Sequence, residues 1–287
     1  MKRFVVTLLW ILVTAALASA QSTGYFPQIA NGIQNDGVTW KTTIYVTNPA
    51  PSGTFEANGT VTFTTSNGSS FPISFIDSTG ASAGTGTISF SLTGGQTKKF
   101  VSTGTGALVV GYGTLSSNFT VYGVALFSEF AANGTLISEA SYQSTPGGTK
   151  QSILVDTQSG FDTGIAYANP NQSGVTITFQ LMNTSGIAVT PSTQQTLSGR
   201  QQTAVFVKGG LFPSAPPLAG TLQILTPGAP ISVVGLRFSS TGLFTTLPPM
   251  TLAGLFSPAF EWLEQRPWLN PLTSFARLLG GLQFRIG

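Results

Sequence analysis

The chain has no cysteine and no histidine among its 287 residues. It therefore lacks disulfides, thiol nucleophiles, the usual zinc ligands and the histidine of a Ser-His-Asp triad. No glycine-rich stretch has the spacing of a phosphate-binding loop, so we expect no nucleotide and no other cofactor. These absences exclude thiol chemistry, triad catalysis and the common zinc sites.

Charge is scarce as well. Charged residues make up only 7% of the chain, against about 25% in ordinary globular proteins. Of the 12 basic residues, two precede Gln21 and three follow Met250, and two of the nine acidic residues follow Met250. Seven of each sign remain between these positions, and they form no basic stripe. Because nucleic acids are bound through basic residues that neutralise phosphates, we expect no nucleic-acid partner.

The N-terminal segment has the layout of a signal peptide. Lys2 and Arg3 precede an apolar run over residues 4–17, and the small residues Ala18-Ser19-Ala20 follow it. This order predicts cleavage after Ala20 and a secreted or cell-surface protein. The alternative, an N-terminal membrane anchor, is disfavoured because the apolar run is shorter than the ~20 residues of a spanning helix.

Most of the chain up to Met250 alternates apolar and polar residues over short runs, which is typical of strands with one buried face. Val61 and Phe63 alternate with threonines, and so do Val175 and Ile177. Asn-Gly pairs at positions 58, 67 and 133 predict tight hairpin turns, because both residues accept positive backbone angles. We expect an all-β protein with antiparallel sheets.

Sequence landmarks occur twice in the same order. Asn48-Pro49 corresponds to Asn169-Pro170, an offset of 121, whereas the glycine turns at Gly94 and Gly199 differ by 105. The first copy therefore has about sixteen extra residues, around positions 72–86. We predict two tandem antiparallel β-sandwich (Ig-like) repeats. The predicted organisation is a signal peptide (1–20), repeat 1 (21–147), repeat 2 (148–250) and a C-terminal tail (251–287).

One segment resembles a known group. Phe26-Pro27-Gln28-Ile29-Ala30-Asn31-Gly32, followed by Trp40, Thr42 and Asn48-Pro49, is similar to a pattern in secreted bacterial proteins of unknown function. Those proteins carry tandem Thr/Gly-rich β-sandwich repeats. The resemblance implies fold and export but no activity.

The tail after Met250 changes in composition, with two Trp and many Leu residues. Ser257-Pro258 and Asn270-Pro271 each place a capping residue before a proline, which predicts helix starts. We expect a short helical segment packed on the second repeat. Attachment to a membrane surface or to a partner, and disorder, are the alternatives.

Carboxylates are the remaining candidates for catalysis or metal binding. Glu129 and Glu139 flank one predicted hairpin, but its register places them on opposite faces, so we expect no paired active site. Asp156 and Asp162 lie in a loop whose spacing matches no compact calcium site, so we expect a turn and no metal. No lysine has a serine three residues before it, which disfavours a Ser-Lys nucleophile.

Four aromatic residues are candidate glycan contacts, because sandwiches often present rings on a sheet face: Trp40, Tyr45, Tyr112 and Tyr122. Packing in the core is the competing interpretation for each. We expect a non-enzymatic, secreted or cell-surface structural or adhesive module with no catalytic residues. A carbohydrate-binding protein is the first alternative and a secreted hydrolase the second, and the expected partner is a cell-surface polysaccharide or protein.

Overall fold

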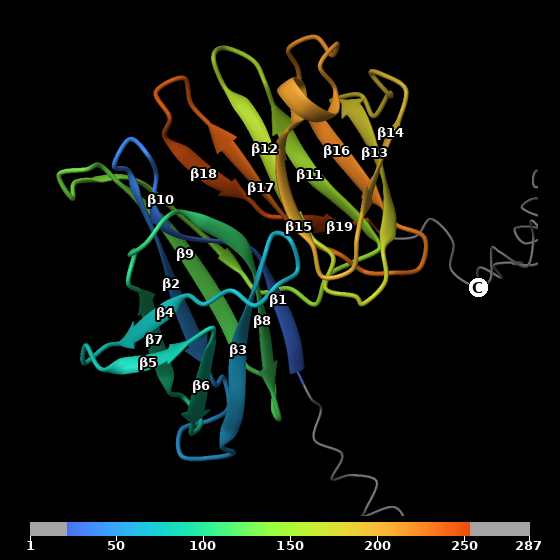
Figure 1. Ribbon diagram of the computed structural model, residues 1–287. Coiled ribbons are helices and arrows are strands. Elements are labelled where there is room, and N and C mark those ends of the chain that lie inside the picture. Colours follow the sequence, from blue (N-terminus) through green and yellow to red (C-terminus); the bar gives the residue numbers. More distant parts are fainter. Residues whose placement is uncertain (1–21, 253–287) are drawn as a thin grey trace, which may run out of the picture. The chain divides into compact units, whose positions relative to one another are not determined.

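The computed structural model describes residues 22–252, which form an all-β structure of three antiparallel sheets with ten, five and four strands (Figure 1). A single π-helical turn, Val207–Leu211, interrupts the strands. No helix among the described residues has the length and apolar character to cross a membrane. The predicted signal peptide, and the predicted helical tail beyond residue 252, lie outside the described residues.

The first half of the structure contains β1 to β10. Their bounds are β1 Ser22–Ile33, β2 Thr39–Thr47, β3 Ala57–Thr65, β4 Ser74–Asp77, β5 Ser82–Thr85, β6 Thr87–Leu92, β7 Thr97–Ser102, β8 Val109–Ser117, β9 Tyr122–Phe130 and β10 Leu136–Gln143. All ten belong to one sheet, because β1 pairs with β8 through Asn31 and then with β2 at Gly32 and Ile33. A Cβ on Gly32 would lie 2.4 Å from the carbonyl oxygen of Ala107, so the crossing requires glycine.

The second half contains β11 to β19. Their bounds are β11 Lys150–Asp156, β12 Asp162–Ala168, β13 Val175–Asn183, β14 Thr193–Leu197, β15 Gln202–Phe206, β16 Ala219–Leu225, β17 Ser232–Phe238, β18 Phe244–Leu247 and β19 Met250–Thr251. The five-stranded sheet has the order β14-β13-β16-β11-β19, and the four-stranded sheet has the order β15-β12-β17-β18. One hydrophobic cluster contains residues of both sheets, among them Ile153, Tyr167 and Phe179.

The two halves have the same strand order. The series β6-β3-β8-β1 of the first half corresponds to β14-β13-β16-β11 of the second, and β7-β2-β9-β10 corresponds to β15-β12-β17-β18. The first half alone has an additional pair of strands, β4 and β5, at the outer edge of β7 (Figure 1). This pair lies within the stretch 72–86 where the sequence predicted extra residues.

A buried asparagine follows β2 in the first half and β12 in the second. The Asn48 amide donates to the carbonyl of Leu92 at 2.9 Å, and the Asn169 amide donates to that of Leu197 at 3.1 Å. Each side chain is almost fully buried. Each amide thereby supplies a hydrogen-bond donor to backbone carbonyls of the strand before the glycine turn. Buried backbone carbonyls need such a donor. The matched landmarks Asn48-Pro49 and Asn169-Pro170 therefore make equivalent contacts.

The predicted alternation is present in β3 and β13, where Val61, Phe63, Val175 and Ile177 are buried. Two of the three predicted Asn-Gly turns are turns, since Gly68 and Gly134 have φ of 88° and 82°. The prediction for Asn58-Gly59 is wrong, because this pair lies inside β3. A Cβ on Gly59 would lie 2.2 Å from the Ser116 carbonyl oxygen, so this glycine allows a close approach of strands.

Segment 26–32 has a structural role at the start of the first half. Phe26 is fully buried, and a register irregularity follows it, between Phe26 and Ile29. The Gln28 carbonyl in this irregular stretch accepts a hydrogen bond from the Tyr142 hydroxyl. The Asn31 side chain accepts from the Gly104 N–H at 2.8 Å and donates to the Thr105 carbonyl at 3.3 Å. The segment thus fixes the bend of β1 between its two neighbours.

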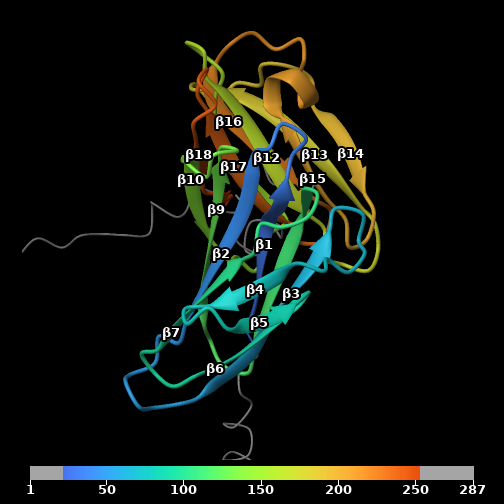
Figure 2. The same ribbon diagram turned by 60° about the vertical axis from the view of Figure 1, so that its left-hand side comes forward.

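The two central strands of the four-stranded sheet, β12 and β17, are buried on both faces over most of their length. Ile165 and Tyr167 of β12 face the cluster shared with the five-stranded sheet, whereas Ala166 belongs to the cluster of the first half. Phe244 of β18 stacks on Phe127 of β9, with ring centroids 5.0 Å apart and planes at 5°. Both views place β18 beside β10 (Figures 1 and 2), and the Phe244 N–H donates to the Ser138 hydroxyl at 3.0 Å. Residues of both halves therefore belong to one hydrophobic cluster, which joins the halves.

Candidate functional site

The four predicted aromatic contacts occupy two kinds of environment. Tyr112 is only 3% exposed, so its ring is not available to a ligand. Trp40 is half-buried and stacks on Phe127 and Phe244 at the edge of the hydrophobic cluster, with ring centroids at 6.1 and 5.8 Å. Its indole nitrogen is buried without a hydrogen-bond partner. The Tyr112 ring is therefore closed to a ligand, and the half-buried Trp40 ring packs on two other aromatic rings.

Tyr45 and Tyr122 lie together on the outer face of the first half. Tyr45 of β2 pairs with Val124 of β9, and Tyr122 lies two residues before Val124, so the two rings share one face of the sheet. Tyr122 is 63% exposed. The Lys99 ammonium lies 5.9 Å from the centroid of the Tyr45 ring. We call Tyr45, Lys99, Tyr122 and Val124 the tyrosine face.

The two glutamates of the β9–β10 hairpin do not form a pair. Glu129 is opposite Ser138, and Glu139 is opposite Ser128, which confirms the predicted register and places the carboxylates on opposite faces. The Ser128 hydroxyl donates to Glu139. Burial, and then the charge of Asp36, raise the pKa of Glu129. Since a glycosidase needs two carboxylates on one site, this hairpin supports no such mechanism.

Asp156 forms an ion pair with Arg237. Its carboxylate accepts hydrogen bonds from Nε and Nη2 of Arg237 at 2.8 and 2.7 Å, and the guanidinium lies 3.3 Å from the centroid of the Phe161 ring. Desolvation by itself would raise the pKa of Asp156, but the hydrogen bonds from Arg237 and Gln158 and the Arg237 charge together lower it. The other predicted turn residue, Asp162, accepts from the Thr163 N–H.

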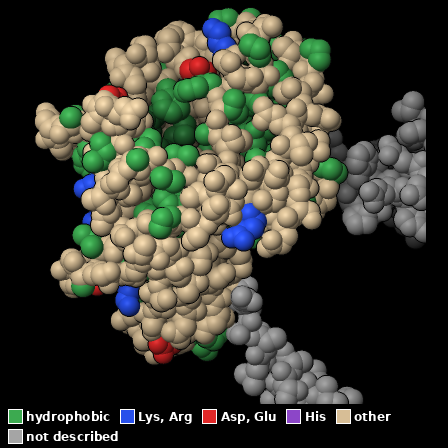
Figure 3. Space-filling model, viewed as in Figure 1, with side chains coloured by type: hydrophobic (Ala, Val, Ile, Leu, Met, Phe, Trp, Pro, Cys, Tyr) green, Lys and Arg blue, Asp and Glu red, His purple; other side chains and the backbone are tan. Residues whose placement is uncertain are grey.

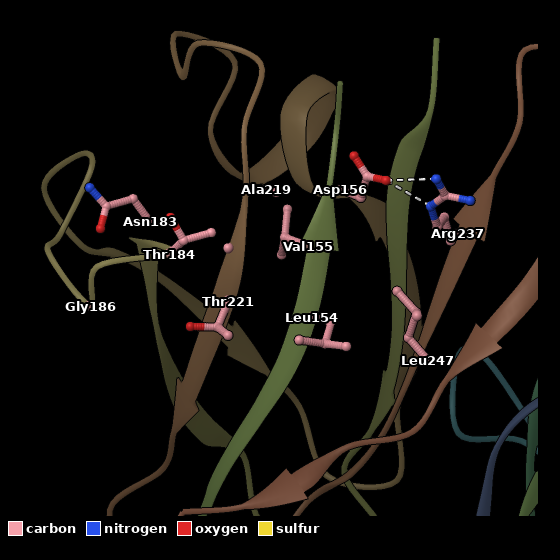
Figure 4. A pocket seen from close by; sticks show the side chains of 11 residues that line it. Leu154, Val155, Asp156, Asn183, Thr184, Gly186, Ala219, Thr221, Arg237 and Leu247 are labelled. Carbon is pink, nitrogen blue, oxygen red and sulfur yellow. Dashed lines mark hydrogen bonds and ion pairs between the residues drawn. The ribbon is translucent and has the colours of Figure 1, made fainter. Parts of the chain in front are cut away.

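Figure 4 shows this ion pair at one end of a largely apolar groove of about 640 Å³. Leu154, Thr221 and Leu247 line its middle, and Asn183 and Thr184 lie at the other end. In residues 22–252, no three His, Cys, Asp or Glu side chains come close enough to hold a metal ion. Asp156 and Arg237 are the only charged residues that line the groove, and their charges neutralise each other.

A second cleft, of about 620 Å³, lies between the two halves, and we call it the amide cleft. Its lining comes from β1, the β3–β4 loop and β8 of the first half, and from β12, β14, the β14–β15 loop and β15 of the second: Gln28, Ser66, Asn67, Val110, Tyr167, Gln195, Thr196, Leu197, Gln201, Gln202, Thr203 and Ala204. None of these twelve residues is charged. The cleft is therefore built mainly from neutral amides and hydroxyls.

Gln202 connects the halves across the floor of the amide cleft. Its side-chain nitrogen donates to the Gln28 side-chain oxygen at 2.6 Å, and its backbone N–H donates to the Ser66 carbonyl at 3.1 Å. The side chain is only 3% exposed, yet its oxygen Oε1 has no hydrogen-bond partner. The Tyr167 hydroxyl donates to the Gln195 side chain, and burial raises the pKa of Tyr167 to about 12, so the phenol stays neutral.

The glutamines of the amide cleft were not predicted as site residues. The only signal in the sequence is the presence of two Gln-Gln pairs, at 194–195 and 201–202, in a chain whose polar residues are mostly Thr and Ser. Gln28 meets Gln202 across 174 positions of the chain. A local pattern carries no information about such a distant contact.

A scan against protein-family models gave no match for this chain. A search of curated proteins likewise gave no matching sequence. The resemblance of segment 26–49 to secreted bacterial repeat proteins thus stays a proposal.

Proposed function

We propose that the chain is a non-catalytic, secreted or cell-surface adhesive module, made of two copies of one Ig-like β-sandwich. The common strand order of the two halves and the equivalent contacts of Asn48 and Asn169 support the duplication. The predicted signal peptide and the resemblance to secreted bacterial repeat proteins support export.

One comparison between equivalent faces carries the proposal. In the second half, the outer face of β12 and β17, with Ala166 opposite Val234, is buried against the first half. In the first half, the equivalent face of β2 and β9 carries half-buried Tyr45 opposite half-buried Val124, with exposed Tyr122 beside them. A sheet face that is an interface in one copy, and an exposed aromatic surface in the other, is suited to contact with a partner.

The two halves also form a rigid support for such a contact, because Phe244, Phe127 and Trp40 stack within one core. A shared core resists the domain motions that a small interface permits. Charged side chains are few and scattered on the face seen in Figure 3. Attraction to the partner therefore depends on aromatic and polar contacts rather than on a strong field.

The proposal is tested by locating the protein in an expressing culture. The full chain is expected in the cell-surface or matrix fraction, and the double variant Tyr45→Ala/Tyr122→Ala in the medium. Ile187→Ala removes an apolar side chain of equal exposure, 63%, at a turn in the second half and serves as the control. Recovery of the unaltered chain only in the medium, as a monomer, would contradict the proposal.

Carbohydrate binding is the second candidate, and the diagonal placement of Tyr45 and Tyr122 favours it. Two tyrosine rings on one open sheet face offer stacking surfaces with polar edges. Retention on a polysaccharide that is lost in the double variant is the expected result. Release of soluble products from that polysaccharide would instead favour the hydrolase alternative.

A further inference from the structure

The amide cleft has hydrogen-bonding capacity that the protein itself does not use. Gln202 Oε1 is buried and unpartnered, and an unsatisfied buried acceptor is unfavourable. Buried polar atoms are otherwise nearly always bonded. Because Gln202 also lines the cleft of about 620 Å³, a ligand donor that enters beside this side chain would complete the arrangement.

The lining also restricts the charge of that ligand. All twelve lining residues are neutral, and the raised pKa of Tyr167, about 12, keeps its hydroxyl protonated. An ionised ligand would lose its hydration without gaining a counter-charge, which is unfavourable. A neutral ligand rich in hydroxyl groups exchanges its water contacts for amide contacts at little cost.

The backbone at the cleft is already engaged. The Gln202 N–H of edge strand β15 donates to the Ser66 carbonyl, so the start of this edge is closed to an added peptide strand, which binds through such groups. The polar groups left are side-chain amides and hydroxyls, which can each meet a hydroxyl as donor or acceptor. This chemistry matches a sugar better than a peptide.

We propose that the amide cleft between the halves binds a neutral carbohydrate chain, with Gln202 Oε1 accepting a hydrogen bond from a ligand hydroxyl and the amides of Gln28, Gln195 and Gln201 contacting neighbouring hydroxyls. The inference rests on the proposed role of the chain as a binding module, and it names a ligand class and a site separate from the tyrosine face.

The chain provides a matched control for the test. The Gln201 side chain accepts from the Ser198 N–H at 3.2 Å, and the Gln96 side chain accepts from the Thr93 N–H at 3.0 Å in the equivalent turn of the first half. Gln201→Ala and Gln96→Ala thus remove the same local hydrogen bond. Only Gln201 lines the cleft.

The experiment measures retention of the full chain on cellulose, xylan, mannan, an α-glucan and a β-1,3-glucan, followed by titration with a soluble oligosaccharide of the retained polymer. Gln201→Ala is expected to raise the Kd about three- to tenfold, as the loss of one neutral hydrogen bond does, and Gln96→Ala to leave it unchanged. Retention is expected to persist in 1 M NaCl, since no charge takes part.

Gln202→Met is the second variant. It removes both the bond to Gln28 and the orphaned oxygen, so we expect binding to weaken at least tenfold while the unfolding temperature changes little. If Gln202→Met unfolds at a much lower temperature, its affinity is not interpreted. The difference in Kd between Gln201→Ala and Gln96→Ala then tests the proposal.

The outcomes separate this inference from the proposed function. Equal effects of Gln201→Ala and Gln96→Ala, or no retention on any neutral polysaccharide, overturn the cleft as a carbohydrate site, while the location experiment still judges the adhesive role. Loss of retention in Tyr45→Ala/Tyr122→Ala but not in Gln201→Ala would move the sugar site to the tyrosine face. Binding of a neutral peptide library that requires Gln201 would replace the carbohydrate by a peptide.

Discussion

The first and second halves have the same strand order, yet the sheets that contain β2 and β12 are buried differently. In β2, buried Thr42, Ile44 and Val46 alternate with half-exposed residues, whereas β12 is buried without interruption from Thr163 to Ala168. The difference arises because the outer face of β12 packs on the first half. The same strand position thus carries Tyr45 on an open face in one half and Ala166 in a core in the other.

The comparison explains why only one half presents an aromatic surface. Ala166 and Val234 are small enough for the halves to approach, and Phe244 of β18 completes the contact by stacking on Phe127. Four sets of substitutions would break or sharpen the comparison between the halves.

The largest effect is expected from Phe244→Ala. Phe244 is 7% exposed and stacks on rings of the first half, so its truncation should lower the free energy of unfolding by about 3–5 kcal/mol. We expect one cooperative unfolding transition for the natural chain and two for the variant, because the contact that couples the halves is lost. Leu243→Ala, at an exposed neighbour, should change the stability by less than about 0.5 kcal/mol. Indistinguishable calorimetric traces for the two variants would show that the halves are not coupled through Phe244.

Asn48→Ala and Asn169→Ala test whether the halves use the same internal contacts. Each substitution leaves buried carbonyls without a donor. It should therefore lower the free energy of unfolding, measured by urea denaturation, by about 1–3 kcal/mol. Because the amides bond equivalent carbonyls at Leu92 and Leu197, the two losses should agree closely. Asn133→Ala removes only an exposed turn contact and serves as the control. A large loss in one half with none in the other would argue against equivalent architecture.

Arg200→Gly compares the two glycine turns. Gly95 in the first half has φ 79°, and Arg200 at the equivalent place in the second has φ 62°. A side chain in this left-handed region is strained, so glycine should raise the stability by about 0.5–1 kcal/mol, reduced by its greater freedom in the unfolded chain. Thermal unfolding measures the gain, and Gly95→Ala should give a loss of similar size. Destabilisation by Arg200→Gly would be incompatible with this explanation.

The smallest effect concerns the ion pair of the second half. Because the pKa of Asp156 is lowered in the folded state, its contribution to stability is complete above the ordinary pKa of Asp and is lost as the pH falls through the folded-state pKa. Asp156→Asn should therefore lower the stability at pH 7 by about 0.2–1 kcal/mol, and the difference should vanish in acid.

Asp77 in the first half provides the contrast to Asp156. The pKa of Asp77 is lowered mainly by hydrogen bonds from the Thr79 hydroxyl and N–H, so Asp77→Asn should show the same direction with pH. Salt at 1 M should weaken the effect of Asp156→Asn and leave that of Asp77→Asn, because only the former depends on a second charge. Equal salt sensitivity of the two variants would contradict the ion pair as the cause.

The residue pattern was sufficient to predict the antiparallel strands and the register of the β9–β10 hairpin. The alternation of residue types in β3 and β13 indicates directly which side chains are buried. The placement of Glu129 and Glu139 on opposite faces follows from the local pairing of the hairpin. The turn predicted at Asn58-Gly59 was wrong, because a glycine that permits a close strand contact cannot be distinguished by sequence from a glycine that permits a turn. The amide cleft was missed because Gln28 and Gln202 converge only after both halves have folded.

The sequence by itself determined the strand-forming pattern, the duplicated landmarks and the absence of cysteine and histidine chemistry, since all of these depend on residue type and local order. The tertiary structure alone decided which face of each half is covered, why Tyr112 is buried and Trp40 packs on other rings while Tyr122 is exposed, and where the glutamines meet. The physical reason is that burial and polar satisfaction depend on neighbours far apart in the chain, and the periodicity of a strand distinguishes its two faces without specifying what covers them.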